Sequence, residues 1–179
     1  ANFSSTADKL AKAFEATSGE TVVIASGSTG QLYAQIKQGA PFDAFLAADE
    51  ARPALLHEDG TATSAPFTYA TGRLALWSPV PDVIPKDGAA FLSQAELKRI
   101  AIANPKLAPY GLAAKESLSA LGLWQTYETR IVMGQNIAQA FQIVAAGGAP
   151  VGFVALSQLL AAPEDLHGSH WTVPMDLHT

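Results

Sequence analysis

Four short polar loops contain the residues of this chain that are best suited to binding chemistry. They are residues 1–5 (ANFSS), 26–30 (SGSTG), 108–111 (APYG) and 134–137 (GQNI), and each stands at the start of an expected helix. Unpaired backbone N–H groups and the helix dipole favour an anion at such a position. None of the loops contains Lys, Arg, Asp or Glu. They therefore predict a site that holds a compact, fully ionised anion with neutral donors and has no catalytic machinery.

Each loop also has a plainer explanation when it is considered alone. Ser28 and Thr29 are common helix-capping residues, and Asn2 and Asn136 are suited to the same role. Tyr110 follows a turn that begins with proline. A single neutral helix start of this kind carries little weight, whereas several in one chain favour a shared anion site.

The sequence gives little support to catalysis or to direct metal ligation. No Gly-Lys-Ser/Thr follows residues 26–30, which excludes a phosphate-binding P-loop, and no serine lies in a Gly-x-Ser-x-Gly elbow. Asp43 and Asp49 could form a two-carboxylate hydrolase site, but helix capping and loop hydrogen bonding are the favoured roles. The four histidines lack metal-ligand spacing. We therefore expect a binding protein that has no cofactor and no direct protein–metal ligand.

The composition allows a substantial core and excludes several classes of partner. The chain has 179 residues, of which 49% are hydrophobic, and this suits one large domain or two small ones. Its net charge of −5 gives no basic surface for nucleic acid. There is no cysteine for a disulfide or a thiolate metal site, and no apolar run approaches the ~20 residues of a membrane span.

Apolar runs and capping signals alternate along the chain as in an α/β fold with mostly parallel sheets. Strands are expected at residues 21–25, 44–47, 68–79, 99–103, 130–133 and 151–154, with an extended segment at 170–173. Helices are expected from residue 5 to Gly19, from the 26–30 loop to Gly39, after an Asp49 cap, and at residues 94–98, 111–121, 137–146 and 157–161. The polar loops would then lie at the carboxyl ends of strands, facing a cleft between two lobes.

The long apolar run at residues 68–79 divides the pattern into two lobes. We expect a first lobe at residues 1–72, to which residues 173–179 return, and a second lobe at residues 73–172. The chain opens on a helix-start loop without a preceding strand, and it stops soon after an extended run. We therefore expect the first lobe to lack its first strand and part of its C-terminal structure.

Several stretches together resemble the periplasmic molybdate- and tungstate-binding proteins of ABC transporters. They are ANF at 1–3, SGSTG at 26–30 with YAQI at 33–36, GAPFDAF at 39–45, AADE at 47–50, Asn104 with APYG at 108–111, and GFVA at 152–155. The resemblance extends over nearly the whole chain. It implies a type II periplasmic binding fold, in which two α/β lobes with mixed, mostly parallel sheets and helices on both faces close on the ligand. It also implies an extracytoplasmic protein that delivers its anion to a membrane permease, and we expect a monomer.

The resemblance also assigns ligand contacts to particular residues. The oxyanion contacts of the family fall on Asn2, Ser28 and Thr29 in the first lobe and on Tyr110 and Ile137 in the second, where backbone N–H groups are the main donors. Some members add a tyrosine hydroxyl directly after the GFV-type strand, where this chain has Ala155. That contact is either missing here or replaced by Tyr110 or another donor nearby.

The chemistry of the loops agrees with such a ligand. Molybdate and tungstate are unprotonated dianions near neutral pH and only accept hydrogen bonds, so a pocket made of donors alone suits them. A protonated phosphate would gain from a carboxylate acceptor, which these loops lack.

Sulfate stays an alternative ligand. It also only accepts hydrogen bonds, so only the size of the pocket would exclude it. The ligand-sensing domain of a transcription regulator stays an alternative function, although no basic recognition helix is present. A phosphoryl or acyl hydrolase would need an acid–base pair.

Overall fold

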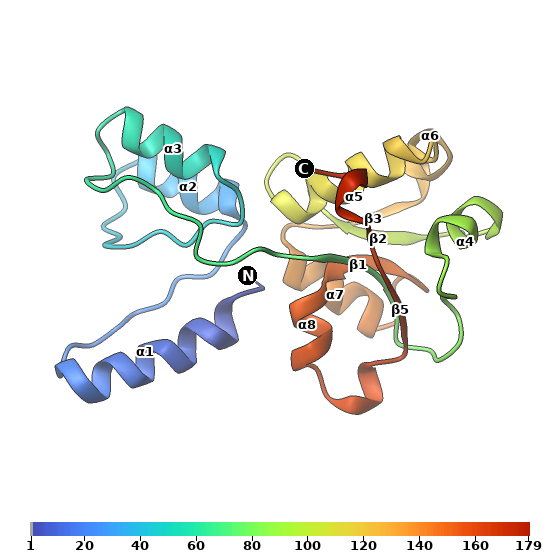
Figure 1. The fold of residues 1–179 in the computed structure, drawn as a ribbon, viewed down its shortest axis with the longest axis horizontal. Helices are drawn as coiled ribbons and strands as arrows, with labels where there is room; N and C mark the ends of the chain where they lie inside the picture. The colour runs from blue at the N-terminus through green and yellow to red at the C-terminus, as the bar shows by residue number, and fades with distance from the viewer. Residues whose placement is uncertain (1) are drawn as a thin grey trace.

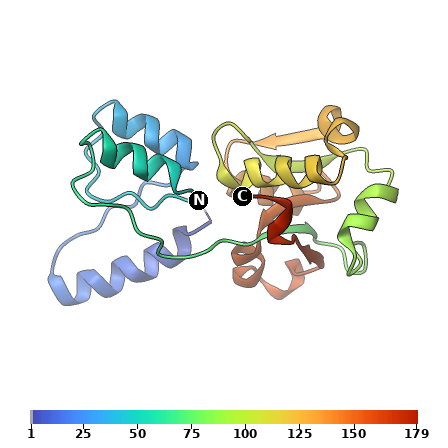
Figure 2. The same cartoon turned by 45° about the horizontal axis from the view of Figure 1, so that its top comes forward.

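A computed structural model of the protein describes residues 2–179, and it has two parts that meet at their centre (Figures 1 and 2). The helical part, residues 2–72, contains α1 (Ser4–Ser18), α2 (Thr29–Lys37) and α3 (Ala51–Glu58). The sheet part, residues 73–179, contains all the strands of the described residues. Ala1, which belongs to the predicted loop at residues 1–5, lies outside the described residues.

The sheet part is built on a mixed sheet. In the described residues its strands are β1 (Leu74–Ser78), β2 (Ile100–Ala103), β3 (Ile131–Gly134), β4 (Gly152–Ala155) and β5 (Ser169–Thr172), in the order β3-β2-β4-β1-β5. β2 pairs parallel with β3 and β4, whereas β1 pairs antiparallel with β4 and β5. The predicted mixed α/β architecture is confirmed, although parallel pairings do not predominate in this sheet.

Helices cover both faces of the sheet. Successive side chains of a strand point to opposite faces, so each face carries its own set of apolar side chains. Leu74 and Leu76 of β1 belong to one core cluster, and Ala75 and Trp77 belong to the other. α5 (Pro109–Ala120) packs on the first face, and α7 (Ile137–Ala145) and α8 (Leu156–Ala161) contribute to the second (Figure 1). α4 (Gly88–Gln94) and α6 (Trp124–Tyr127) lie at the far end of this part.

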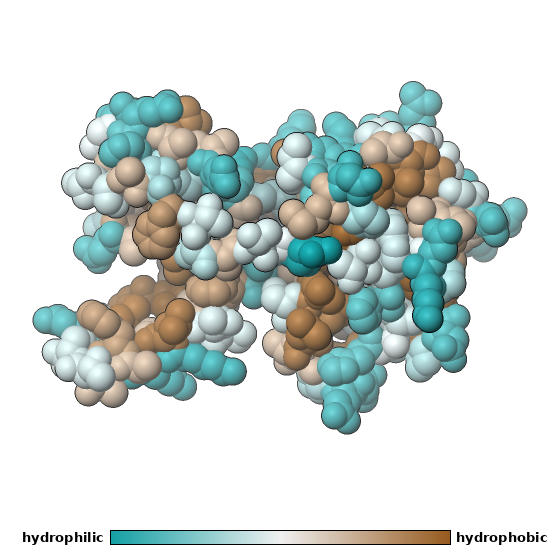
Figure 3. Space-filling model, in the orientation of Figure 1, coloured by the Kyte–Doolittle hydropathy of each residue, from teal (hydrophilic) through white to brown (hydrophobic). Residues whose placement is uncertain are grey.

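The helical part differs most from the sequence prediction. Residues 21–25 and 44–47, expected as strands, form no ladder with any described segment, and the longer strand expected at 68–79 begins only at Leu74. A β-branched run becomes a strand only when a neighbour takes up its backbone hydrogen bonds. Without one, Val23 is 90% exposed and α1 buries no residue completely. Apolar side chains consequently gather along α1 on the surface (Figure 3).

The last residues also lie elsewhere than expected. We expected residues 173–179 to return to the first lobe, but they pack against the sheet part. Val173 extends β5, since its N–H donates to the Leu74 carbonyl at 2.9 Å, and its side chain is fully buried. The N–H and hydroxyl of Thr179 donate to the Glu116 carboxylate of α5 at 2.9 and 2.8 Å.

Candidate functional site

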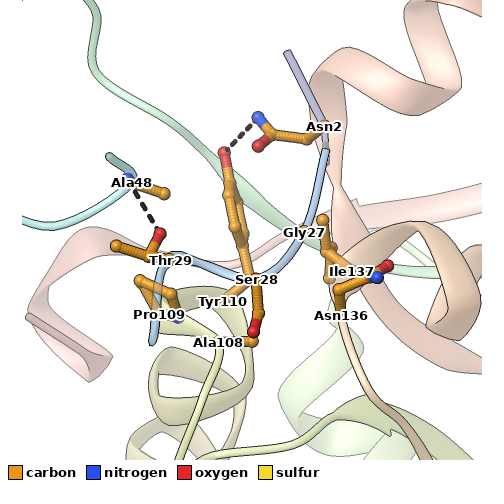
Figure 4. Close-up of a pocket in the computed structure, with 10 residues that line it drawn as sticks. All are labelled: Asn2, Gly27, Ser28, Thr29, Ala48, Ala108, Pro109, Tyr110, Asn136 and Ile137. Carbon is orange, nitrogen blue, oxygen red and sulfur yellow. Dashed lines mark hydrogen bonds between the residues drawn. The ribbon is translucent and has the colours of Figure 1, made fainter. Parts of the chain in front are cut away.

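A small cavity lies where the helical part meets the sheet part (Figure 4). Its volume is about 20 Å³, slightly more than the ~10–15 Å³ that a water molecule needs. The five predicted site residues all line it, together with five others that the prediction did not include. The lining residues are Asn2, Gly27, Ser28, Thr29, Ala48, Ala108, Pro109, Tyr110, Asn136 and Ile137.

α2 reaches the cavity with its N-terminus, where Ser28 is the N-cap residue. Ser28 and Gln31 form a capping box: the Ser28 Oγ accepts from the Gln31 N–H at 3.3 Å, and the Gln31 Oε1 accepts from the Ser28 N–H at 3.1 Å. The Ser28 hydroxyl also donates to Gln31 Oε1 at 2.9 Å. In this structure the hydroxyl of Ser28 therefore stabilises the helix start, and its direct donation to a ligand stays a prediction.

Thr29, the first residue of α2, has a different arrangement. Its Oγ1 accepts from the Ala48 N–H at 3.1 Å, which ties the helix start to the segment before α3. A hydroxyl that accepts one hydrogen bond still has its own proton to donate. The backbone N–H of Thr29 also belongs to the first turn, where no helix carbonyl can accept it. Thr29 is buried and lines the cavity.

The sheet part contributes two further helix N-termini. α5 begins with Pro109, which has no N–H, so the first amide that this helix can offer is that of Tyr110. α7 begins with Ile137, and its N-cap Asn136 accepts from the Gln139 N–H through Oδ1 at 3.1 Å. The backbone amides of Tyr110 and Ile137 are therefore first-turn donors at the cavity.

The Tyr110 side chain joins the two parts. Asn2 Nδ2 donates to the Tyr110 hydroxyl at 3.1 Å, as the dashed line in Figure 4 shows. The residue is only 8% exposed, and burial, with a smaller contribution from Tyr69, raises the pKa of Tyr110 to about 12. At neutral pH this phenol is therefore a neutral donor.

The electrostatics of the cavity come from dipoles alone. None of the lining residues carries a charge. Three helices present their N-termini to the cavity, and each terminus acts as roughly +0.5 of an elementary charge. Among the described residues, no group of three His, Cys, Asp or Glu side chains could hold a metal ion. The arrangement suits a small anion that binds as an acceptor of hydrogen bonds.

The five lining residues that the prediction missed differ in how they could have been found. Gly27, Ala108, Pro109 and Asn136 lie in the predicted loops, directly beside predicted residues. Ala48 has no such signal, because only the folded chain brings it to Thr29. A larger, open hollow of about 460 Å³ beside Glu96, Lys98 and Arg130 contains none of the predicted residues.

Helix N-termini from two parts of this α/β chain meet at one uncharged cavity, and the chain has the fold of a type II periplasmic ligand-binding protein. The chain is a member of the bacterial extracellular solute-binding protein family, whose model matches residues 1–179. Among the residues that the structure describes, no helix is both long and apolar enough to cross a bilayer.

Individual relatives cover nearly the whole chain. The molybdate-binding protein ModA of Rhodobacter capsulatus is 45% identical over 179 residues, which are 99% of this chain and 69% of that protein. ModA of Azotobacter vinelandii is 46% identical, over 99% of this chain and 71% of that protein. The solved structure of the Azotobacter vinelandii periplasmic molybdate-binding protein superposes with a TM-score of 0.91 at 42% identity, and covers 99% of this chain and 78% of that one. Each of these relatives is a molybdate-binding protein.

Proposed function

We propose that this protein binds molybdate or tungstate outside the cytoplasm and delivers the anion to the permease of an ABC transporter. The observation that carries the proposal is the meeting of three helix N-termini, from both parts of the chain, at one cavity without a charged lining residue. The similarity to molybdate-binding proteins over nearly the whole chain supports it. The protein has no catalytic role in this proposal.

The proposed ligand contacts come from both parts. Three of the proposed donors are backbone amides in the first turns of α2, α5 and α7, those of Thr29, Tyr110 and Ile137. The Thr29 hydroxyl and the Asn2 side chain complete the donor set. Ser28 holds the start of α2, and its predicted contact with the anion belongs to the same proposed set. A hydrogen bond to a charged acceptor contributes about 1.5–3 kcal/mol, and neutral donors avoid the cost of burying a counter-charge.

The proposed mechanism is hinge closure. We assign the lobes to the helical part, residues 2–72, and to the sheet part, and the hinge to residues 68–73, where the chain crosses between them (Figure 1). An anion that contacts both lobes binds the closed form better than the open one, and so shifts the equilibrium towards closure. The closed monomer is then the form that the permease recognises.

Titration calorimetry with molybdate, tungstate, sulfate and phosphate tests the proposal. We expect tight binding of molybdate and tungstate, weaker binding of sulfate and the weakest binding of phosphate, whose proton finds no carboxylate acceptor in the lining. Preference for sulfate would reassign the ligand while leaving the donor site in place. Absence of heat with all four anions would overturn the proposal.

A further inference from the structure

Two hydrogen bonds join the parts of the molecule beside the cavity without belonging to its lining. The Gly30 N–H donates to the Leu107 carbonyl at 2.9 Å, and Arg52 Nη2 donates to the Lys106 carbonyl at 3.4 Å. The donors lie at the starts of α2 and α3, and both acceptors lie in the loop of residues 104–108 that leads into α5. The first turn of α2 thus directs the Gly30 amide across the interface, while the neighbouring residue Thr29 lines the cavity.

Glycine is required at position 30 for this approach. A Cβ on Gly30 would lie 2.9 Å from the Leu107 carbonyl oxygen and 3.2 Å from the Leu107 Cα, both of which are backbone atoms. It would also lie 3.2 Å from Arg52 Nη2. Any side chain at this position therefore pushes the two parts away from each other.

The other members of the contact are held in place on both sides. Asp49 forms an ion pair with Arg52 Nη1 and accepts the Arg52 N–H at 2.9 Å, which leaves Nη2 facing Lys106. In the opposing loop the Asn104 side chain accepts the Lys106 N–H at 3.0 Å, and the Asn104 N–H donates to the Gly134 carbonyl of β3 at 2.7 Å. Both sides are therefore anchored to regular structure.

We propose that Gly30 and Arg52 are positioning residues that form an interlobe latch with Leu107 and Lys106. The latch stabilises the closed form whether or not the anion is present. Because apparent affinity falls in proportion to the fraction of protein in the competent form, the latch raises affinity without touching the ligand. This inference rests on the proposed function for its effect on affinity, but its effect on closure is independent of the ligand.

The variants Gly30→Ala and Arg52→Met test the latch, with Lys37→Met as the matched control. Alanine is a better helix former than glycine, so Gly30→Ala does not weaken α2 itself. Its Cβ meets backbone atoms across the interface, and within the helical part it meets only the flexible end of the Arg52 side chain. Lys37 forms an ion pair with Asp59 at 2.6 Å, but that pair lies within the helical part. We expect molybdate affinity to fall roughly three- to tenfold in both latch variants, by calorimetry, and to stay unchanged in the control.

Small-angle X-ray scattering of the ligand-free proteins reports on closure. A merely structural role of the two latch residues would leave this measurement unchanged. We expect a larger radius of gyration for both latch variants than for the wild type and Lys37→Met, with Tm close to that of the wild type. Wild-type scattering in both latch variants would overturn the latch, even if Tm or affinity had fallen. Failure of the wild type itself to bind molybdate would instead refute the proposed function, and the scattering comparison would still decide the latch.

Discussion

Two hydroxyls at the cavity are oriented by hydrogen bonds that they accept from the protein. The Thr29 Oγ1 accepts from the Ala48 N–H, and the Tyr110 hydroxyl accepts from the Asn2 side chain. Because a lone pair of each oxygen is occupied, the proton points elsewhere, and in the proposed site the Thr29 proton is the one directed to the anion. Such preorientation allows a neutral residue to act as a specific donor without a buried counter-charge.

Replacing Thr29 with valine keeps the shape of the side chain and removes the hydroxyl. We expect Thr29→Val to lower molybdate affinity by about tenfold or more, since hydrogen bonds to charged groups contribute about 1.5–3 kcal/mol. Stability should change little, because Ala48 is exposed and water can accept its N–H. Calorimetry and thermal unfolding check the two expectations. Thr17→Val is the matched control, because the Thr17 hydroxyl only bonds back to α1 carbonyls; equal affinity losses in both variants would contradict the role of Thr29.

Because the Tyr110 phenol is buried, the free energy of unfolding depends on pH in the alkaline range. Its pKa rises from the usual value of 10 to about 12 in the folded protein because of burial, so the folded state keeps a proton that the unfolded state has lost. The stability that the protonated phenol contributes is therefore complete below the pKa of Tyr110 in the unfolded state, and it is lost as pH rises from about 10 towards 12. Urea unfolding between about pH 9 and 11 should show a steeper loss of stability for the wild type than for Tyr110→Phe. Parallel curves would show that Tyr110 is not the responsible group.

At the scale of elements, the site depends on where helices begin, and the caps decide this. Asn136 starts α7 at the cavity, whereas Asp87 starts α4 at the far end of the sheet part by accepting the Ala90 N–H at 2.9 Å. The two cap side chains accept the same kind of hydrogen bond, from the N–H three residues further on, but they lie at different distances from the site. They therefore separate the stabilising role of a cap from a role in binding.

We expect Asn136→Ala and Asp87→Ala each to lower the free energy of unfolding by about 1 kcal/mol, the usual cost of a lost N-cap. Only Asn136→Ala should also weaken molybdate binding, because a frayed first turn moves the Ile137 amide away from the cavity. Urea unfolding and calorimetry measure the two effects. A similar loss of affinity in Asp87→Ala would mean that binding follows global stability and not the start of α7.

The sequence predicted the helix starts of the site better than the strands around it. Caps and first turns are local, so Ser28, Asn136 and the Pro109 start of α5 are readable from a few neighbouring residues. Strands depend on partners far along the chain, and residues 21–25 and 44–47 have the composition of strands without a described partner. The helix expected at residues 94–98 lies earlier, at Gly88–Gln94, because Asp87 caps it.

At the scale of the molecule, the two parts are joined by one crossing of the chain and by a few polar contacts. The contacts from Asn2 to Tyr110 and from Gly30 to Leu107 lie on segments far apart in the sequence. Sequence patterns specify each segment but not which segments meet, so Ala48 and the interlobe hydrogen bonds could not be predicted. The family resemblance placed the predicted ligand contacts together only because the folded structure of the family already brings such residues together.

The net charge of the whole protein opposes binding of the proposed dianion. The effect of salt on binding therefore tests whether the donors of the site are neutral. The protein carries a net charge of −5, so a dianion is repelled at long range, whereas the attraction comes from dipoles at the cavity. Salt shortens the Debye length from about 30 Å at 0.01 M to about 8 Å at 0.15 M and screens the repulsion first. We therefore expect the Kd for molybdate, measured by calorimetry, to stay unchanged or to fall as sodium chloride rises over this range. A site that used lysine or arginine would show the opposite trend, so a Kd that rises severalfold with salt would contradict binding by neutral donors.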